Sequence, residues 1–457
     1  MDEGPADHLK KLGLKELVAI GIGGMIGGGI FSTLGLLLQY AGVAAPFAFS
    51  LGAIIALLSA YSYAKFSYYH PSIGGTIEYI AMVMENLFIL DYINALLWIG
   101  YIVMVALYAY AFGSYSAALL GFREGTFWYL VVQHVMITLV LLAFTAINVM
   151  GSHIMSKVED VLVYIKVGIL LFFIAIGFMR ANPSVIFSQP WPPINMVLLG
   201  GLIIFSAYEG FGIISNASLE AKKKEDVYRA FFISVMIVAF IYISIAYVAV
   251  ATLNPEVVAK YKDYALGIIA EPLLGKAGFV IIAIAALLST ASAINATIFG
   301  AGRIAHFLPK VNKVVGENVK AIELLKYEIL LSGLIALVLA NLYDLSNIAV
   351  MGSLAFLLIY ATVNYAATKM ADVLWAKRPI TFTAFVLNLI AASVLAWTSL
   401  SVNFWSQLMS LATLLIPPFI IAIIIRPIRK YLFYKHFVEY FGDFFRKPRE
   451  LEKTCCA

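Results

Sequence analysis

Twelve apolar segments dominate this chain, and each is long enough to cross a lipid bilayer as a helix, which takes about 20 residues. Hydrophobic residues make up 62% of the sequence and charged residues only 12%, whereas about a quarter of residues are charged in soluble proteins. We therefore predict an all-α integral membrane protein with twelve transmembrane helices. The predicted spans are residues 15–39, 43–68, 87–120, 126–149, 157–180, 193–219, 228–253, 277–302, 323–342, 345–369, 379–399 and 405–425.

The distribution of basic residues predicts the orientation of these spans. With both termini on one side, that side receives 25 of the 31 lysines and arginines. Because cytoplasmic loops carry the excess of basic residues, we expect both termini in the cytoplasm and the protein in the cell membrane. The net charge of +5 follows from this topology and does not indicate a nucleic-acid partner. The chain start lacks a cleavage pattern, so we expect the first span to be retained.

The first span contains a glycine-rich stretch, with six glycines in the nine positions from Gly21 to Gly29. Each glycine costs about 1 kcal/mol relative to alanine inside a helix, so we predict that the helix is interrupted here. Unwound backbone is tolerated within a bilayer only where protein or a water-filled cavity satisfies its polar groups. The stretch therefore predicts a binding site.

The sixth span carries a second interruption, with Ser206, Glu209, Gly210 and Gly212 in an otherwise apolar run. A carboxylate within a membrane is costly and usually functional. For Glu209 the structural alternative is an internal pair with a lysine or with a tyrosine hydroxyl. The end of the second span, by contrast, favours an interfacial aromatic belt with a basic residue. Its members are Tyr61, Tyr63, Lys65, Tyr68, Tyr69 and His70.

The two broken spans each open a group of five spans that start on opposite sides of the membrane. This arrangement is typical of the inverted repeats of secondary transporters, which hold substrate near the midplane. The predicted divisions are a cytoplasmic lead over 1–13, a first five-helix repeat over 14–180, a second inverted repeat over 181–370, two peripheral helices over 371–431 and a cytoplasmic tail over 432–457. The predicted external segment 254–275 has the length of a re-entrant or lid element.

Free backbone at the two breaks would suit a zwitterion. Amides at a helix N-terminus favour a carboxylate, and the donors here would be Gly27, Gly28 and Gly29. The carbonyls of Met25 and of residues 206–209 would accept from a cation, either a metal ion or an α-ammonium group.

Lys166 lies within the fifth span, in the run Val161 to Leu170. The structural alternative is that its side chain snorkels to the cytoplasmic edge. An intramembrane lysine more often faces a cavity and takes part in proton transfer, so we predict a role in proton coupling.

The sequence resembles the amino acid–polyamine–organocation superfamily of permeases over roughly residues 10–430. The first-span motif G-x-[IM]-I-G-x-G-I-F is matched by residues 23–31, and the sixth-span pattern F-x-x-Y-x-G-F by residues 205–211. The run from Ser289 to Gly300 is similar to the eighth span of the same proteins.

This resemblance implies a leucine-transporter-type fold with a 5+5 inverted repeat and broken helices 1 and 6. It is closest to broad-specificity, proton-coupled amino acid transporters, in which a fifth-span lysine replaces a bound sodium ion. Lys166 stands at that position, and its ammonium is expected to reach the Gly23 carbonyl and the Ser289 hydroxyl. The implied coupling ion is the proton, without another cofactor or metal. The implied substrate-binding residues are Met25, Gly27, Gly28, Gly29, Phe205, Ser206, Tyr208 and Glu209.

Glu209 departs from the family pattern, because relatives usually have an apolar residue there. Three roles are open for it: selection of cationic substrates, a second proton carrier, or a pair with Lys166. Ser206 stands where some relatives place a bulky aromatic gate.

The function predicted is import of amino acids with protons, and the main alternative is an amino acid or polyamine exchanger of the same fold. A channel is less expected because no span shows a continuous polar lining. An enzyme is not expected, because the six histidines are scattered without a catalytic pattern. The sequence does not predict an oligomeric state.

Overall fold

The computed structural model describes residues 12–72, 74–150, 155–307 and 321–432. These residues form helices and no strand, and one isolated β-bridge joins Leu12 to Ala221. The all-α prediction is confirmed. The long helices are α1 (Leu14–Met25), α2 (Gly29–Ala41), α3 (Ala45–Tyr69), α5 (Leu87–Leu119), α6 (Phe127–Met150), α7 (Met155–Arg180), α9 (Ile194–Ile203), α11 (Lys224–Thr252), α13 (Ala265–Phe307), α14 (Ala321–Leu342), α15 (Leu345–Lys369), α16 (Arg378–Val402) and α17 (Phe404–Leu432). Shorter elements are η1 (Gly42–Ala44), α4 (Thr76–Ala81), α8 (Ser184–Phe187), η2 (Ile204–Tyr208), α10 (Ile213–Asn216), η3 (Ser218–Glu220), α12 (Pro255–Ala259) and η4 (Lys262–Tyr264).

Eleven stretches of the described residues are long and apolar enough to cross a membrane. The first of them, Gly29–Tyr69, runs through α2 and α3 and takes in parts of the first two predicted spans. The twelve-span count, the inverted repeat and the predicted domain divisions therefore stay predictions.

Both expected helix interruptions are present. In the first span α1 ends at Met25 and α2 begins at Gly29. In the sixth span α9 ends at Ile203, the tighter helix η2 follows, and α10 begins only at Ile213. The break in the sixth span is held by α15. The Ser353 hydroxyl accepts from the Ser206 amide at 2.9 Å and donates to the Ile203 carbonyl at 2.6 Å, so it satisfies backbone groups that the end of a helix leaves unpaired.

The two interrupted spans pack directly on each other through glycines. Gly210 has φ +112°, and a Cβ atom built there would lie 2.5 Å from the Gly24 carbonyl. A Cβ atom built at Gly24 would in turn lie 2.7 Å from the Gly210 oxygen. Only glycine on both sides allows this backbone approach.

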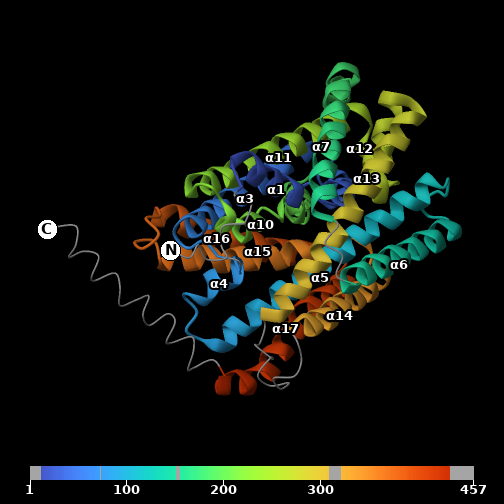
Figure 1. Ribbon diagram of the computed structural model, residues 1–457. Helices are drawn as coiled ribbons and strands as arrows, with labels where there is room; N and C mark the ends of the chain where they lie inside the picture. Colours follow the sequence, from blue (N-terminus) through green and yellow to red (C-terminus); the bar gives the residue numbers. More distant parts are fainter. Residues whose placement is uncertain (1–11, 73, 151–154, 308–320, 433–457) are drawn as a thin grey trace.

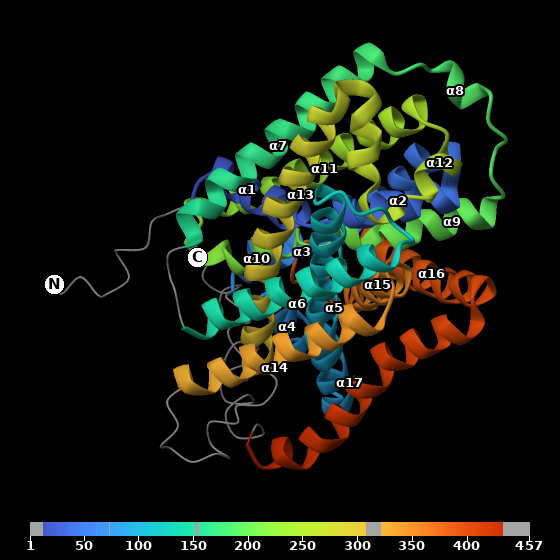
Figure 2. The same cartoon turned by 90° about the vertical axis from the view of Figure 1, so that its right-hand side faces the viewer.

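The other helices enclose this pair. Helix α5 packs against α13, α15 and α17, and Figure 2 shows it at the centre of the bundle. Helix α11 packs against α1 and α3, while α6 and α14 lie side by side on another face (Figure 1). Figure 2 also shows α8 on the connection that runs along the rim from α7 to α9.

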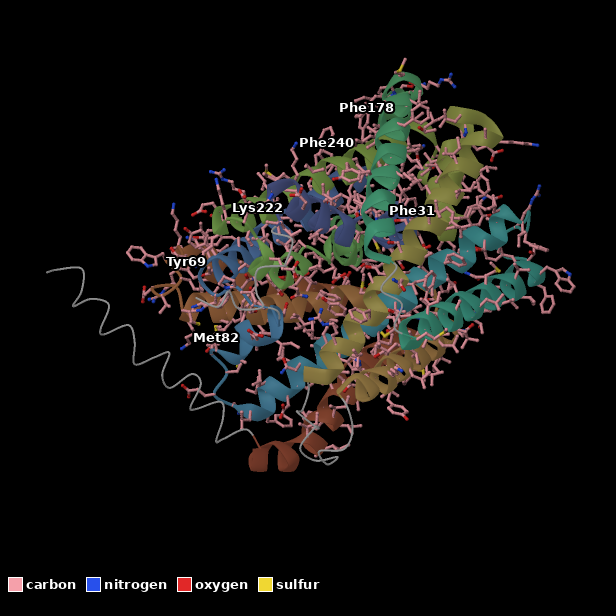
Figure 3. The ribbon with its side chains drawn as sticks, in the orientation of Figure 1. Phe31, Tyr69, Met82, Phe178, Lys222 and Phe240 are labelled. Carbon is pink, nitrogen blue, oxygen red and sulfur yellow. The ribbon has the colours of Figure 1, made fainter. Side chains whose placement is uncertain are left out.

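Two loops that are predicted to be cytoplasmic lie at the same end of the bundle. In Figure 3, Tyr69, Met82 and Lys222 lie near one end, and Phe178 lies near the other. The predicted cytoplasmic loops after the second and sixth spans therefore share a face, while the orientation of that face in the cell stays a prediction. At this end the Leu12 amide donates to the Glu220 carbonyl at 2.7 Å. The Lys222 amide donates to the Leu12 carbonyl at 2.8 Å, so the start of α1 is tied to the end of the sixth span.

The prediction of an interfacial aromatic belt at the end of the second span is wrong for two of its tyrosines, Tyr61 and Tyr63, whereas Tyr68 and Tyr69 are half-buried. Tyr63 is 1% exposed, and its hydroxyl lies 2.9 Å from that of Thr76. The Tyr61 hydroxyl accepts from the Lys377 amide at 2.8 Å. Both rings are turned inward because helices α4 and α15 and the chain before α16 cover this part of α3.

Residues 254–275, the segment predicted to be external, pack in part over α2 through α12 and η4. The backbone of Lys262 packs against Gly35, where any side chain would collide with it. The buried Asp263 accepts from the Tyr110 hydroxyl at 3.4 Å, and its amide donates to the Glu124 carboxylate at 3.4 Å. Burial, followed by the negative charge of Asp263, raises the pKa of Glu124 to about 8.

The contact between Asp263 and the Glu124 carboxyl predicts that the stability of the folded protein depends on pH. The pKa of Glu124 is higher in the folded protein than in the unfolded chain. Its contribution to stability is therefore complete below its ordinary pKa and is lost as the pH rises through about 8. We expect the unfolding temperature of the purified protein to fall between about pH 5 and about pH 8, and to fall less in Glu124→Gln. Glu256→Gln, on the exposed face of α12, is the control. Equal pH dependence of wild type and Glu124→Gln would contradict the prediction.

Candidate functional site

Three free amides form a cradle at the first break. Among the described residues, the amides of Gly27, Gly28 and Gly29 donate to no protein acceptor. Gly29 is the first residue of α2, and its cap Gly28 has no side chain to satisfy the helix end. The positive end of the helix dipole and these amides together favour an anion, such as a carboxylate.

The ring of Tyr108, from α5, covers the cradle. A Cβ atom at Gly28 would overlap this ring, and one at Gly27 would lie 3.9 Å from its Cζ. Tyr108 is buried, so the cradle is closed in this conformation. Access to the cradle requires this ring to move.

Side-chain hydroxyl groups donate hydrogen bonds to the backbone carbonyls of the first break. The Tyr242 hydroxyl, from α11, donates to the Met25 carbonyl at 2.9 Å and to the Ala207 carbonyl at 3.2 Å. The Ser289 hydroxyl donates to the Ile26 carbonyl at 3.2 Å and also to that of Gly27. Tyr242 therefore links the two broken spans at the place where the sequence predicts an ammonium group.

Tyr242 was not identifiable as a site residue from the glycine pattern, because it lies in a regular span. One signal was present: a tyrosine hydroxyl within an apolar helix needs a hydrogen-bond acceptor. Its partners, however, depend on how α11 is rotated against α1.

Replacing Tyr242 with phenylalanine tests this link. The change leaves two buried carbonyls without their donor and frees the two breaks to shift, so we expect apparent substrate affinity to fall roughly tenfold, the effect of losing about one buried hydrogen bond. Substrate dependence of uptake gives the affinity, and Tyr247→Phe on the same helix is the matched control. Tighter binding by Tyr242→Phe would show instead that the hydroxyl competes with substrate.

Lys166, from α7, reaches the end of α1. It is 4% exposed, and its Nζ donates to the Gly23 carbonyl at 3.3 Å. Lys166 and Ser289 line the same cavity of about 10 Å³, together with Ile169 and Ala285. The expected contact with Gly23 is present, whereas the Ser289 hydroxyl donates to the first break.

The remaining predicted side chains lie in the sixth span and are all buried. The Phe205 ring packs against that of Tyr360, with centroids 5.8 Å apart. The Ser206 hydroxyl donates to the Ile203 carbonyl at 3.2 Å, and the Tyr208 hydroxyl to the Phe49 carbonyl at 3.1 Å. The hydroxyls of Ser206 and Tyr208 thus bond to the protein's own backbone.

The polar group of Glu209, by contrast, lies among other side chains. Its carboxyl lies beside the Tyr108 hydroxyl and near Tyr63, Tyr101 and Tyr360. Within the described part of the chain it forms no ion pair, with Lys166 or with any other residue.

Comparisons with known proteins cover nearly the whole chain. Residues 12–416 match the family described as amino acid permease. The chain is 32% identical over 390 residues to the inner membrane transport protein YbaT of Escherichia coli, covering 83% of this chain and 88% of that protein. It is also 32% identical over 383 residues to an uncharacterized protein of Methanocaldococcus jannaschii, covering 83% and 87%. A shorter match, 27% identical over 229 residues, links it to cationic amino acid transporter 7 of Arabidopsis thaliana, covering 45% and 38%.

Proposed function

This chain belongs to the amino acid permease family and is a multi-pass membrane transporter rather than an enzyme, and we propose that it imports amino acids together with protons by alternating access. The substrate carboxylate would bind the amides of Gly27, Gly28 and Gly29, between the two broken spans. Its ammonium would bind carbonyls of the breaks beside the Tyr242 hydroxyl.

One observation carries the coupling: the buried Lys166 donates to the Gly23 carbonyl. Gly23 lies in the last turn of α1, at the negative end of the helix dipole. A protonated ammonium there makes a charge-assisted hydrogen bond, about twice as strong as a neutral one. The charged lysine would hold α1 against α7.

Loss of the proton from Lys166 weakens the contact between α1 and α7. A neutral amine keeps only an ordinary hydrogen bond to Gly23, so α1 could move away from α7 and open the substrate site to the cytoplasm. The cavity of about 10 Å³ beside Lys166 and Ser289 is at the lower limit for one water molecule, which would serve as the proton acceptor. Reprotonation of Lys166 would then restore the starting arrangement.

Uptake into proteoliposomes tests this proposal. We expect a labelled amino acid from a mixed panel to accumulate above its external concentration when the interior is alkaline, and a protonophore to abolish this accumulation. Uptake that needs an amino acid preloaded inside, and ignores the pH gradient, would show an exchanger. Non-saturating flux without accumulation would show a channel.

A further inference from the structure

Glu209 lies where the chain leaves helical geometry. It follows η2 with φ −59° and ψ 149°, and Gly210 follows it with φ +112°. This abrupt turn places the carboxyl in the interior, where the residue is 7% exposed. A buried carboxylate without a partner is unfavourable unless it meets a cation or a proton.

The surroundings of Glu209 are aromatic. Four tyrosines from three helices lie near its carboxyl: Tyr63 from α3, Tyr101 and Tyr108 from α5, and Tyr360 from α15. Tyr101 is half-buried and the other three are buried. The rings also pack on one another, with centroids 5.5 Å apart for Tyr63 and Tyr360 and 4.9 Å apart for Phe211 and Tyr360.

A buried carboxylate close to the glycine cradle is suited to binding a cation. Burial disfavours the charged form of a carboxyl group unless an opposite charge lies beside it. The cationic end of a substrate would supply that charge, and nearby aromatic rings attract ammonium and guanidinium groups that lie over a ring face. The site therefore suits a cationic group of the substrate as the bound partner of Glu209.

The cation that fits is part of a substrate. Tyr108 spans the distance between the cradle and Glu209, because its ring covers the cradle at Gly28 while its hydroxyl lies beside the Glu209 carboxyl. The cradle and the carboxyl are thus about one long side chain apart. An amino acid with its carboxylate at the cradle can direct a side-chain cation to Glu209.

Lys166 does not supply this cation. It bonds to Gly23 from the α7 side and lines a cavity with α13 residues, whereas Glu209 faces α3, α5 and α15. Lys166 and Glu209 thus have separate roles: Lys166 makes the coupling contact with α1, and Glu209 lies at the substrate site.

We propose that Glu209 binds the side-chain cation of the transported amino acid, so that lysine and arginine are preferred to neutral amino acids of equal length. This inference rests on the proposed amino acid transport, because it places the substrate carboxylate at the glycine cradle.

The test compares L-lysine with L-norleucine, which has the same carbon chain without the ammonium. We expect L-lysine to raise the unfolding temperature of the purified protein at a concentration at least about tenfold lower than L-norleucine, the effect of one charge-assisted hydrogen bond. Glu209→Gln has the same shape and should abolish this difference. Glu220→Gln, at an exposed site, should keep it.

Two results would overturn the inference. One is that L-lysine raises the unfolding temperature of the wild type no more than L-norleucine does at the same concentration. The other is an unchanged lysine preference in Glu209→Gln, including the case in which this variant changes only the pH profile of uptake. Lysine binding that depends on Glu209 but never leads to pH-driven accumulation would support the inference and refute the proposed coupling, so the two failures are distinct.

Discussion

Replacing Lys166 with alanine abolishes proton-driven accumulation of amino acids, while substrate binding persists. The substitution removes the ammonium that donates to Gly23 at 3.3 Å and leaves the substrate cradle, four residues further along, intact. Without a reversible charge, the position of α1 no longer depends on a proton. Uptake into proteoliposomes with an alkaline interior should fall to the level of protein-free vesicles, and substrate should still raise the unfolding temperature of the variant.

Lys166→Arg separates charge from proton exchange. An arginine side chain stays charged at all accessible pH values, so this variant should bind substrate and still fail to accumulate it.

The Lys166→Ala variant needs a check on its stability. The Gly23 carbonyl loses its donor in this variant, which costs about 1–3 kcal/mol for a buried acceptor. The unfolding temperature of the variant therefore serves as the check that loss of uptake is not loss of fold. Normal pH-driven uptake by Lys166→Ala would refute the proposed role.

The two helix breaks could be predicted from the sequence because their cause is local. Six glycines in nine positions weaken a helix wherever it packs, and the break at Met25 to Gly29 lies within that stretch. The contact between Lys166 and Gly23 came from family resemblance, because the two residues lie 143 positions apart.

The tyrosines around the site could not be predicted in the same way. Tyr63, Tyr108, Tyr242 and Tyr360 lie on regular helices, and a tyrosine in such a helix is equally consistent with packing, an interfacial position or a site. Which face of each helix turns inward depends on the packing of the whole bundle. The sequence therefore identified the carboxyl of Glu209 but not the rings that lie near it.

Replacing Gly210 with alanine should abolish transport. Gly210 has φ +112°, which side-chain-bearing residues rarely adopt, and strain of this kind costs about 1–3 kcal/mol. The added Cβ atom would also lie 2.5 Å from the Gly24 carbonyl and 2.9 Å from the Met25 amide nitrogen. Because these are backbone atoms, they cannot rotate aside, so α1 and the sixth span must separate.

This separation would displace both halves of the candidate site at once. Met25 and Ala207 would no longer share the Tyr242 hydroxyl, and the glycine cradle would move away from Glu209. Gly212→Ala is the matched control, because a Cβ atom there meets its nearest neighbour, Tyr63, at an ordinary 3.5 Å. We expect Gly212→Ala to transport and bind substrate like the wild type, and Gly210→Ala to do neither. Wild-type uptake by Gly210→Ala would mean that transport does not need the backbone contact between the two broken spans.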